Sequence, residues 1–196
     1  MSRLKNLILV MIVSCAAIAV AAPASHAQGT KIITIDEGRI LRDSKAGKDI
    51  QAKLSNIETQ INNELVPAST ALEAEGNALN AELQGKTREQ VAGDAALVGK
   101  LAAYEKKAND FGKARQKAAN EYGLTERQAL VDFNKALEPV LLEVVREQGA
   151  EVVMSRSAVI YSVDTIDVSA SVVSKLDAAT PTISVSRKRI PDQPAQ

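Results

Sequence analysis

The chain has 196 residues, and its composition excludes several common classes of protein. It carries 24 basic and 24 acidic side chains, so no excess of positive charge indicates a nucleic-acid partner. Aromatic residues make up only 3% of the chain and tryptophan is absent, which argues against a dense core within one chain. We therefore expect helix association, and contacts between copies of the chain, to supply much of the stability.

Residues 1–27 have the features of a secretory signal peptide. Arg3 and Lys5 precede an apolar run, residues 7–20, that is too short to span a bilayer as an ordinary transmembrane helix. The sequence Ser-His-Ala at residues 25–27 fits the small-x-small pattern of a cleavage site. We therefore expect an exported, cleaved chain with no stable membrane insertion.

Cleavage would start the mature chain at Gln28 and would remove Cys15 and His26, the only cysteine and the only histidine. The mature chain then has 22 basic and 24 acidic side chains, a net charge of −2. It lacks the usual nucleophile–base pairs, metal ligands and phosphate loops, so we expect no enzyme activity and no cofactor. Two alternatives exist for the N-terminus: a retained anchor, or lipidation of Cys15, although the apolar run continues past this cysteine to Ala22.

The mature chain opens with a strand signal followed by helix signals. Residues 31–36, KIITID, are rich in β-branched side chains and predict the first strand. A short turn or helical segment is expected at residues 39–42. Ser44 then fits a helix N-cap, and a helical pattern continues as far as Gly149. Pro67 lies within this pattern and predicts a kink just before it.

Apolar residues recur at helical spacing through residues 44–149, with one expected break at residues 84–87. Gly85 can end a helix in the left-handed conformation, and Thr87 with Gln90 matches a capping box that starts the next helix. Two helices joined there make an antiparallel hairpin with arms about 60 Å long, at 1.5 Å per residue. Such arms are too long to bury in one small globule, so the hairpin should project from a body.

Opposite charges on the two halves favour antiparallel pairing. Folding at Gly85 predicts these cross-arm neighbours: Glu73 with Lys100, Glu64 with Lys106 and Lys107, and Glu58 with Arg115. The alternative is that these charges only solvate the helix surfaces. The second helix also contains Gly93, Gly99, Gly112 and Gly123. They are interpreted either as small residues where the helices touch or as positions that make the arm pliable.

The hairpin should re-enter the body near Pro139 and end at Gly149. Beyond it the sequence predicts further body elements: strands at residues 151–155 and 158–162, a helix from Ser169 as N-cap through Leu176, and a strand candidate at residues 182–186. Residues 187–196, with two prolines, are predicted to be a disordered tail.

These elements predict an α+β, mainly α fold, in which a long antiparallel helical hairpin, or coiled-coil arm, projects from a small β-strand body. The body takes residues 28–43 and 150–186, and the arm takes residues 44–149. A body with few strands leaves exposed edges, so an assembly of several copies is expected.

Several features follow one another along the mature chain: a strand, then Asp36, Ile40-Leu41, Ser44 and Ala46-Gly47, a long polar hairpin, a strand pair ending in Tyr161, and a helix start at Asp167-Val168-Ser169. This order, with the export signal, resembles the OmpH/Skp family of periplasmic chaperones. The resemblance implies a periplasmic homotrimer whose three helical hairpins enclose a cavity. It also implies ATP-independent holding of unfolded outer-membrane proteins, which prevents their aggregation.

A second interpretation is a structural coiled-coil spacer or adaptor of the cell envelope that binds one folded partner. The glycines of one arm and the proline of the other favour the chaperone, because a spacer gains from stiffness.

If the arms hold unfolded chains, apolar side chains near the tip should be partly exposed, because no body packs against them. The candidates for client contact are Leu79, Leu83, Val91 and Leu97. For Leu79 and Leu97, simple closure of the tip is an equal alternative. The candidates for the interface between copies are Ile33, Ile35, Val159 and Tyr161.

Overall fold

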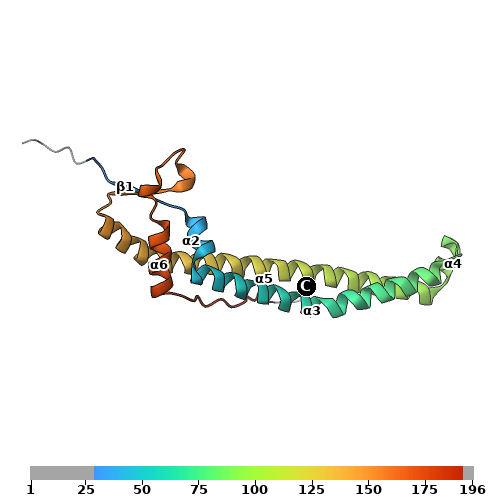
Figure 1. The fold of residues 1–196 in the computed structure, drawn as a ribbon. Coiled ribbons are helices and arrows are strands. Elements are labelled where there is room, and N and C mark those ends of the chain that lie inside the picture. The colour runs from blue at the N-terminus through green and yellow to red at the C-terminus, as the bar shows by residue number, and fades with distance from the viewer. Residues whose placement is uncertain (1–28, 192–196) are drawn as a thin grey trace, which may run out of the picture. The chain divides into compact units, whose positions relative to one another are not determined.

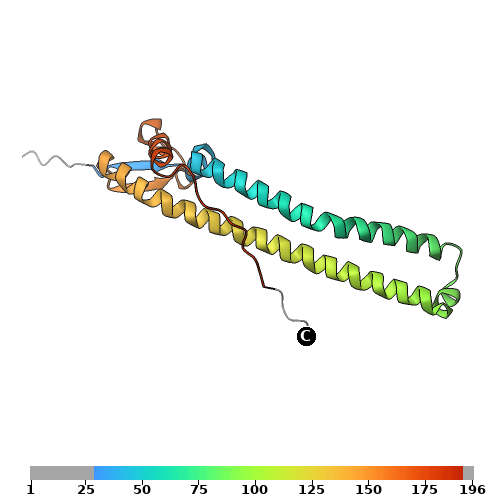
Figure 2. The same cartoon turned by 90° about the horizontal axis from the view of Figure 1, so that it is seen from below.

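The computed structural model describes residues 29–191. From Lys31 onward the chain forms one compact unit. The predicted signal peptide, Cys15 and the last five residues lie outside the described residues. Within the unit, two long helices run side by side, and the short elements other than α4 (Arg88–Gly93) gather at one end of them (Figure 1, Figure 2). This is the mainly helical α+β arrangement, with an arm and a small body, that the sequence predicts.

The body is built around a two-stranded parallel sheet. Strand β1 (Ile32–Ile35) pairs with β2 (Val152–Ser155), with Ile33 opposite Val153. The β-branched side chains of β1 alternate between the faces of the sheet, and Ile33 and Ile35 are buried. Two short 3₁₀ turns, Arg156–Ala158 and Asp164–Ile166, follow β2.

Two short helices close the body. Helix α2 (Glu37–Asp43) begins where the Asp36 carboxylate accepts the Arg39 N–H at 2.8 Å. Helix α6 (Ser169–Ala179) is tied to the same point, because the Asp36 N–H donates to the Ser169 hydroxyl at 2.8 Å. The core lies where β1, α2, α6 and the base of the arm meet: its buried members include Ile33, Ile40, Ile50, Phe133, Val144, Val172 and Leu176.

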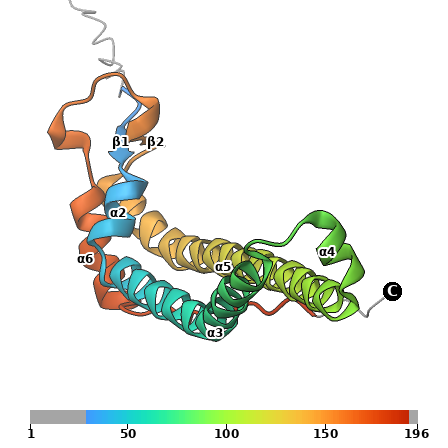
Figure 3. The same cartoon turned by 90° about the vertical axis from the view of Figure 1, so that its right-hand side faces the viewer.

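The arm consists of α3 (Lys45–Leu83) and α5 (Ala95–Gln148). As predicted, the Ser44 hydroxyl caps α3 by accepting the Gly47 N–H at 3.1 Å, and Gly149 ends α5 in the left-handed conformation. Both long helices continue through their prolines, Pro67 and Pro139. Figure 3 shows that α3 changes direction along its length, in keeping with the expected effect of a proline in a helix.

The tip has the predicted turn and one break that the sequence analysis missed. Gly85 is left-handed, and the Thr87–Gln90 capping box starts a helix, as expected. That helix, α4 (Arg88–Gly93), is only 6 residues long, because the Asp94 carboxylate accepts the Leu97 N–H at 3.1 Å and starts α5 afresh.

The second break shifts the register of the arm, so the predicted cross-arm pairs are wrong. Lys100 meets Glu82 at 2.6 Å rather than Glu73, and Lys107 meets Glu75 at 2.8 Å rather than Glu64. Both pairs require the chain to reverse near residue 91 instead of near Gly85. The charge pattern was therefore right about the antiparallel direction and wrong about the register.

Other predicted elements also need correction. Residues 158–162 form no strand, since β2 leads into the 3₁₀ turns, and residues 182–186 form no strand either. Ser169 is the first residue of α6 rather than a capping side chain, because its hydroxyl is used by Asp36. A methyl group added at any of the four glycines at positions 93, 99, 112 and 123 would meet nothing within 4 Å, so the two helices do not touch there.

Crosslinking tests the register. In a chain that begins at Gln28, cysteines at positions 82 and 100 should be joined within one chain by a short bismaleimide, because the native side chains meet there. Cysteines at positions 73 and 100 are the matched control and should remain unjoined. Mass spectrometry of the digested monomer band reads the outcome, and efficient joining of the 73–100 pair would contradict the observed register.

Candidate functional site

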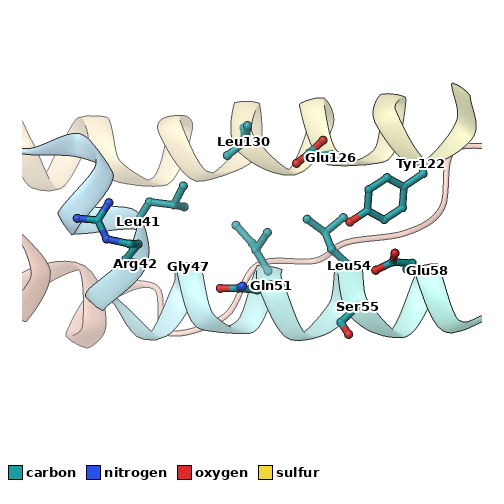
Figure 4. A pocket seen from close by; sticks show the side chains of 11 residues that line it. Leu41, Arg42, Gly47, Gln51, Leu54, Ser55, Glu58, Tyr122, Glu126 and Leu130 are labelled. Atoms are coloured by element: carbon teal, nitrogen blue, oxygen red, sulfur yellow. The ribbon is translucent and has the colours of Figure 1, made fainter. Parts of the chain in front are cut away.

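The arm carries an open groove between its two helices close to the body, with a volume of about 410 Å³ (Figure 4). Its apolar lining comes from three helices: Leu41 of α2, Ile50 and Leu54 of α3, and Tyr122 and Leu130 of α5. Positions 50 and 54 are one turn apart and positions 122 and 130 are two turns apart, so each pair lies on one helix face. Charged side chains of Arg42, Glu58 and Glu126 complete the lining.

Tyr122 contributes the aromatic ring of this groove. Figure 4 shows its ring between the two long helices, on the same side as Leu54. Burial, together with the nearby carboxylates of Glu58 and Glu126, raises the pKa of the Tyr122 hydroxyl, so it stays neutral at physiological pH. The groove therefore presents an uncharged, mostly apolar floor with a charged rim.

A second, shallower depression of about 270 Å³ lies farther along the arm. Leu65, Val66 and Phe111 line it, and the Arg115 guanidinium lies 6.0 Å from the centre of the Phe111 ring. Among residues 29–191, apolar surface is thus spread along the arm in small patches.

The four candidates for client contact divide into two pairs. Leu79 and Leu97 are 5% and 2% exposed, which fits the alternative that they hold the tip together. Leu83 and Val91 are half-buried and keep some accessible surface. Their use in client binding stays a prediction, and for Leu79 and Leu97 the expected partial exposure is absent.

The structure adds exposed apolar side chains that the sequence analysis did not single out. On the arm these are Val66, Val98, Leu124, Leu130, Val131 and Leu142. Leu124, Val131 and Leu142 are spaced by 7 and 11 residues, so they lie on one face of α5. In the sequence, each of these residues is an apolar side chain that lies outside the apolar stripe by which the two helices pair. A search for helical periodicity considers only the stripe, so it leaves such residues out.

The four candidates for the interface between copies also separate. Ile33 and Ile35 are buried in the core of their own chain, so they have no surface to offer. Val159 is half-buried and Tyr161 is 80% exposed. Tyr161 has exposed apolar neighbours in Ile160 and Val163, which makes this segment an apolar patch on the body.

The residues that were predicted to start a disordered tail instead contact the arm. We call residues 181–191 the strap, and the views agree that it leaves α6 and runs along the two long helices (Figure 1, Figure 2). Arg187 bridges Glu64 of α3 and Glu121 of α5, at 2.7 Å to each carboxylate. Glu64 therefore pairs with the strap and not with Lys106 or Lys107.

The strap holds a buried carboxylate. Glu121 is only 1% exposed; it accepts the Ile190 N–H at 3.0 Å and the Arg187 Nε–H at 2.8 Å. Burial by itself raises the pKa of Glu121, but the hydrogen bonds from these two donors lower it by more than burial raises it. The pKa of Glu121 therefore lies below the ordinary value. Hydrogen bonds from Arg187 and Arg189 likewise lower the pKa of Glu64.

Within residues 29–191, no group of His, Cys, Asp and Glu side chains could hold a metal ion. Over the same residues, every helix is too short or too polar to cross a membrane.

A long two-helix arm with scattered apolar patches, set on a small mixed body, defines a helical-arm protein with an extended, partly apolar surface. The family model "Outer membrane protein (OmpH-like)" matches residues 31–176, and the chain belongs to this family. A crystal structure of a protein from Caulobacter crescentus CB15, described as an OmpH-like outer membrane chaperone, is similar. It is 29% identical, has a TM-score of 0.70, and the match covers 86% of this chain and 99% of that chain. No curated protein matches the chain.

Acidification should release the strap. The depressed pKa values mean that the Glu64 and Glu121 contacts stabilise the strap fully above the ordinary glutamate value of 4.5. This stabilisation is lost as the pH falls below that value through the lowered pKa of each group. Hydrogen-exchange protection of the Lys188 and Ile190 amides should therefore drop once the pH falls below about 4.5, before that of Ala129 in the core.

Glu121→Gln is the control, because it removes the charge of the buried side chain that titrates. It should lower the protection at neutral pH and flatten its dependence on pH. Protection of the two strap amides that does not change with pH would contradict this assignment.

Proposed function

We propose that this protein is an ATP-independent periplasmic holding chaperone, which binds unfolded outer-membrane proteins between its helical arms and prevents their aggregation. The observation that carries the proposal is the apolar surface spread along a projecting arm. Membership of the OmpH-like family supports a periplasmic chaperone role, and the similar protein from Caulobacter crescentus is described as an OmpH-like outer membrane chaperone. Export through the predicted signal peptide would bring the chain to the periplasm.

The distribution of apolar surface suits an unfolded partner better than a folded one. A folded partner needs one complementary patch, whereas an unfolded chain can make many weak contacts over a long surface. The open groove, the depression at Phe111 and the exposed face of α5 supply such contacts over much of the arm. The glycines of α5 that touch no neighbour fit a pliable arm better than a rigid spacer.

The proposed assembly is a homotrimer held together by the body. Its support is the apolar patch of Ile160, Tyr161 and Val163, together with the small sheet. Strand β1 is flanked by β2 and by a bridge to Asp167, whereas β2 has no second partner among residues 29–191. An unpaired strand edge beside an apolar patch favours pairing with another copy.

Shortening the arm tests the holding function. Glu75 lies opposite Lys107, and four residues further toward the body Ala71 lies opposite Phe111. Deleting residues 72–110 and joining the ends through a short glycine-containing turn therefore keeps the register. The shortened chain should keep its body and lose most suppression of aggregation, measured by light scattering of an unfolded outer-membrane protein diluted from denaturant.

A surface variant separates arm length from apolar contact. Changing Val66, Val98, Leu124 and Val131 to serine keeps the full arm and should also weaken suppression severalfold. The matched control changes four exposed asparagines, Asn63, Asn77, Asn80 and Asn109, to serine and should behave as the unmodified chain. A shortened arm that protects the client fully would refute the proposal, and a chain that never protects it would favour the spacer.

Charge in the apolar patch tests the assembly. Ile160→Asp with Tyr161→Asp should convert a trimer into monomers at micromolar concentration, because three copies would bring like charges together in an apolar contact. Sedimentation velocity measures the mass, and circular dichroism checks that the helices remain. Val66→Asp, on the arm, is the control and should leave the trimer intact; an unmodified chain that sediments as a monomer would disprove the assembly.

A further inference from the structure

The strap crosses the arm in an extended, alternating manner. Along it, Ile183 is buried and Val185 and Arg187 are half-buried, whereas Ser184, Ser186 and Lys188 are exposed. Alternation with a period of two is the mark of an extended backbone that turns one face toward a surface. Within residues 29–191 the strap nevertheless pairs with no strand, since its main chain is held by side chains of the arm.

Four hydrogen bonds hold this main chain. The Ile183 N–H donates to Asp49 at 2.9 Å and its carbonyl accepts Lys53 Nζ at 2.7 Å. Farther along, the Lys188 N–H donates to the Thr125 hydroxyl at 2.9 Å and the Ile190 N–H donates to Glu121 at 3.0 Å. Main-chain groups are the same in every residue except proline, so these contacts would hold other sequences as well.

The side chains that point inward define a pattern. Ile183 enters the main core, and Arg187 reaches the paired carboxylates. Val185 packs against the main core and against a second apolar cluster, formed by Ile57, Ile61 and Ala118 of the arm. We call the surface formed by Asp49, Lys53, Glu64, Glu121 and Thr125 the strap groove. It accepts an apolar residue, a second apolar residue two positions later and a basic residue two positions after that.

We propose that the strap groove is a binding site for extended segments of unfolded client chains, and that the strap is its built-in occupant, which a client segment displaces. The proposal rests on the proposed holding function and adds to it the site and the class of segment bound. The strands of outer-membrane barrels alternate apolar and polar side chains, which is the alternation that the groove accepts. The open groove and the strap lie on different sides of the α3–α5 pair, with the strap behind the open groove in Figure 4, so the two surfaces are separate.

The test measures binding of a fluorescein-labelled peptide with the sequence of residues 181–191 by fluorescence anisotropy. In the full mature chain, Arg187→Ala weakens the built-in strap but leaves the groove intact. The peptide should therefore bind this variant at least tenfold more tightly than the unmodified chain. Ser186→Ala is the matched control: its side chain is exposed and lies between the inward-pointing Val185 and Arg187, so peptide binding should match that of the unmodified chain.

A second test holds the strap in place with a covalent link. A bismaleimide that contains a disulfide can tie the strap to the arm through cysteines at positions 132 and 188, because Lys188 lies within electrostatic reach of Asp132 on α5 and neither residue belongs to the strap groove. The linked chain should not bind the peptide, and reduction of the linker should restore binding to the level of the unmodified chain. Comparison of the linked and reduced chains also tests the proposal if Arg187→Ala loses helical structure by circular dichroism.

Competition then identifies the segment that the groove prefers. An unlabelled peptide with apolar residues at alternate positions followed by arginine should displace the probe, whereas a scrambled peptide with adjacent apolar residues should not. The proposal is overturned if Arg187→Ala binds the probe no better than the unmodified chain, or if the alternating peptide fails to displace it.

These outcomes are separable from those of the holding function. If the linked and reduced chains bind the peptide differently but suppress client aggregation equally, the strap groove is not where clients are held, and the arm surface alone carries that function. If neither form suppresses aggregation, the proposed holding function fails, and peptide displacement still reports on the groove.

Discussion

The arm stands on contacts between residues that are more than 130 positions apart in the chain. Asp36 donates its N–H to Ser169, Lys45 donates its N–H to Asp177, and Ile183 donates its N–H to Asp49. Each joins the start of the arm to the segment that follows it, and the core around Ile40, Val172 and Leu176 forms only when both are present. Because these contacts span the whole hairpin, the body and the arm cannot fold independently of one another.

Local chemistry made much of this fold predictable. The caps at Ser44 and Thr87 and the left-handed Gly149 depend on neighbours within a few residues, so the sequence displays them directly. The register of the arm depends instead on whether Asp94 starts a new helix or simply lies within one. That choice is decided by packing at the tip, where Leu79 and Leu97 are buried, and local signals cannot weigh it.

The candidate surfaces were less predictable for a related reason. An apolar stripe shows that a helix face will be covered but does not say by what. Ile33 and Ile35 read equally well as an interface between copies, yet α5 and α6 of the same chain cover them. The extended segment after α6 read as a strand followed by a disordered tail, because its partners are Asp49, Glu64, Glu121 and Thr125 in distant helices and not another strand. The sequence shows the alternation of apolar and polar residues in this segment. It does not show the surface that the segment contacts.

The position of Arg187 has a mechanical consequence. It ties α3 to α5 at Glu64, which leaves the 19 residues from 65 to 83 of α3 beyond the tie. At 1.5 Å per residue, the part of α3 beyond the tie is about 30 Å long. Pro67 lies three residues past the tie, where a missing backbone hydrogen bond softens the helix. The contact at Glu64 therefore fixes α3 next to a flexible point at Pro67. A rotation of about 10° at this point would move the tip by about 5 Å over the length of about 30 Å. The lower arm can thus stay clamped to the body while the outer half adjusts to objects of different width.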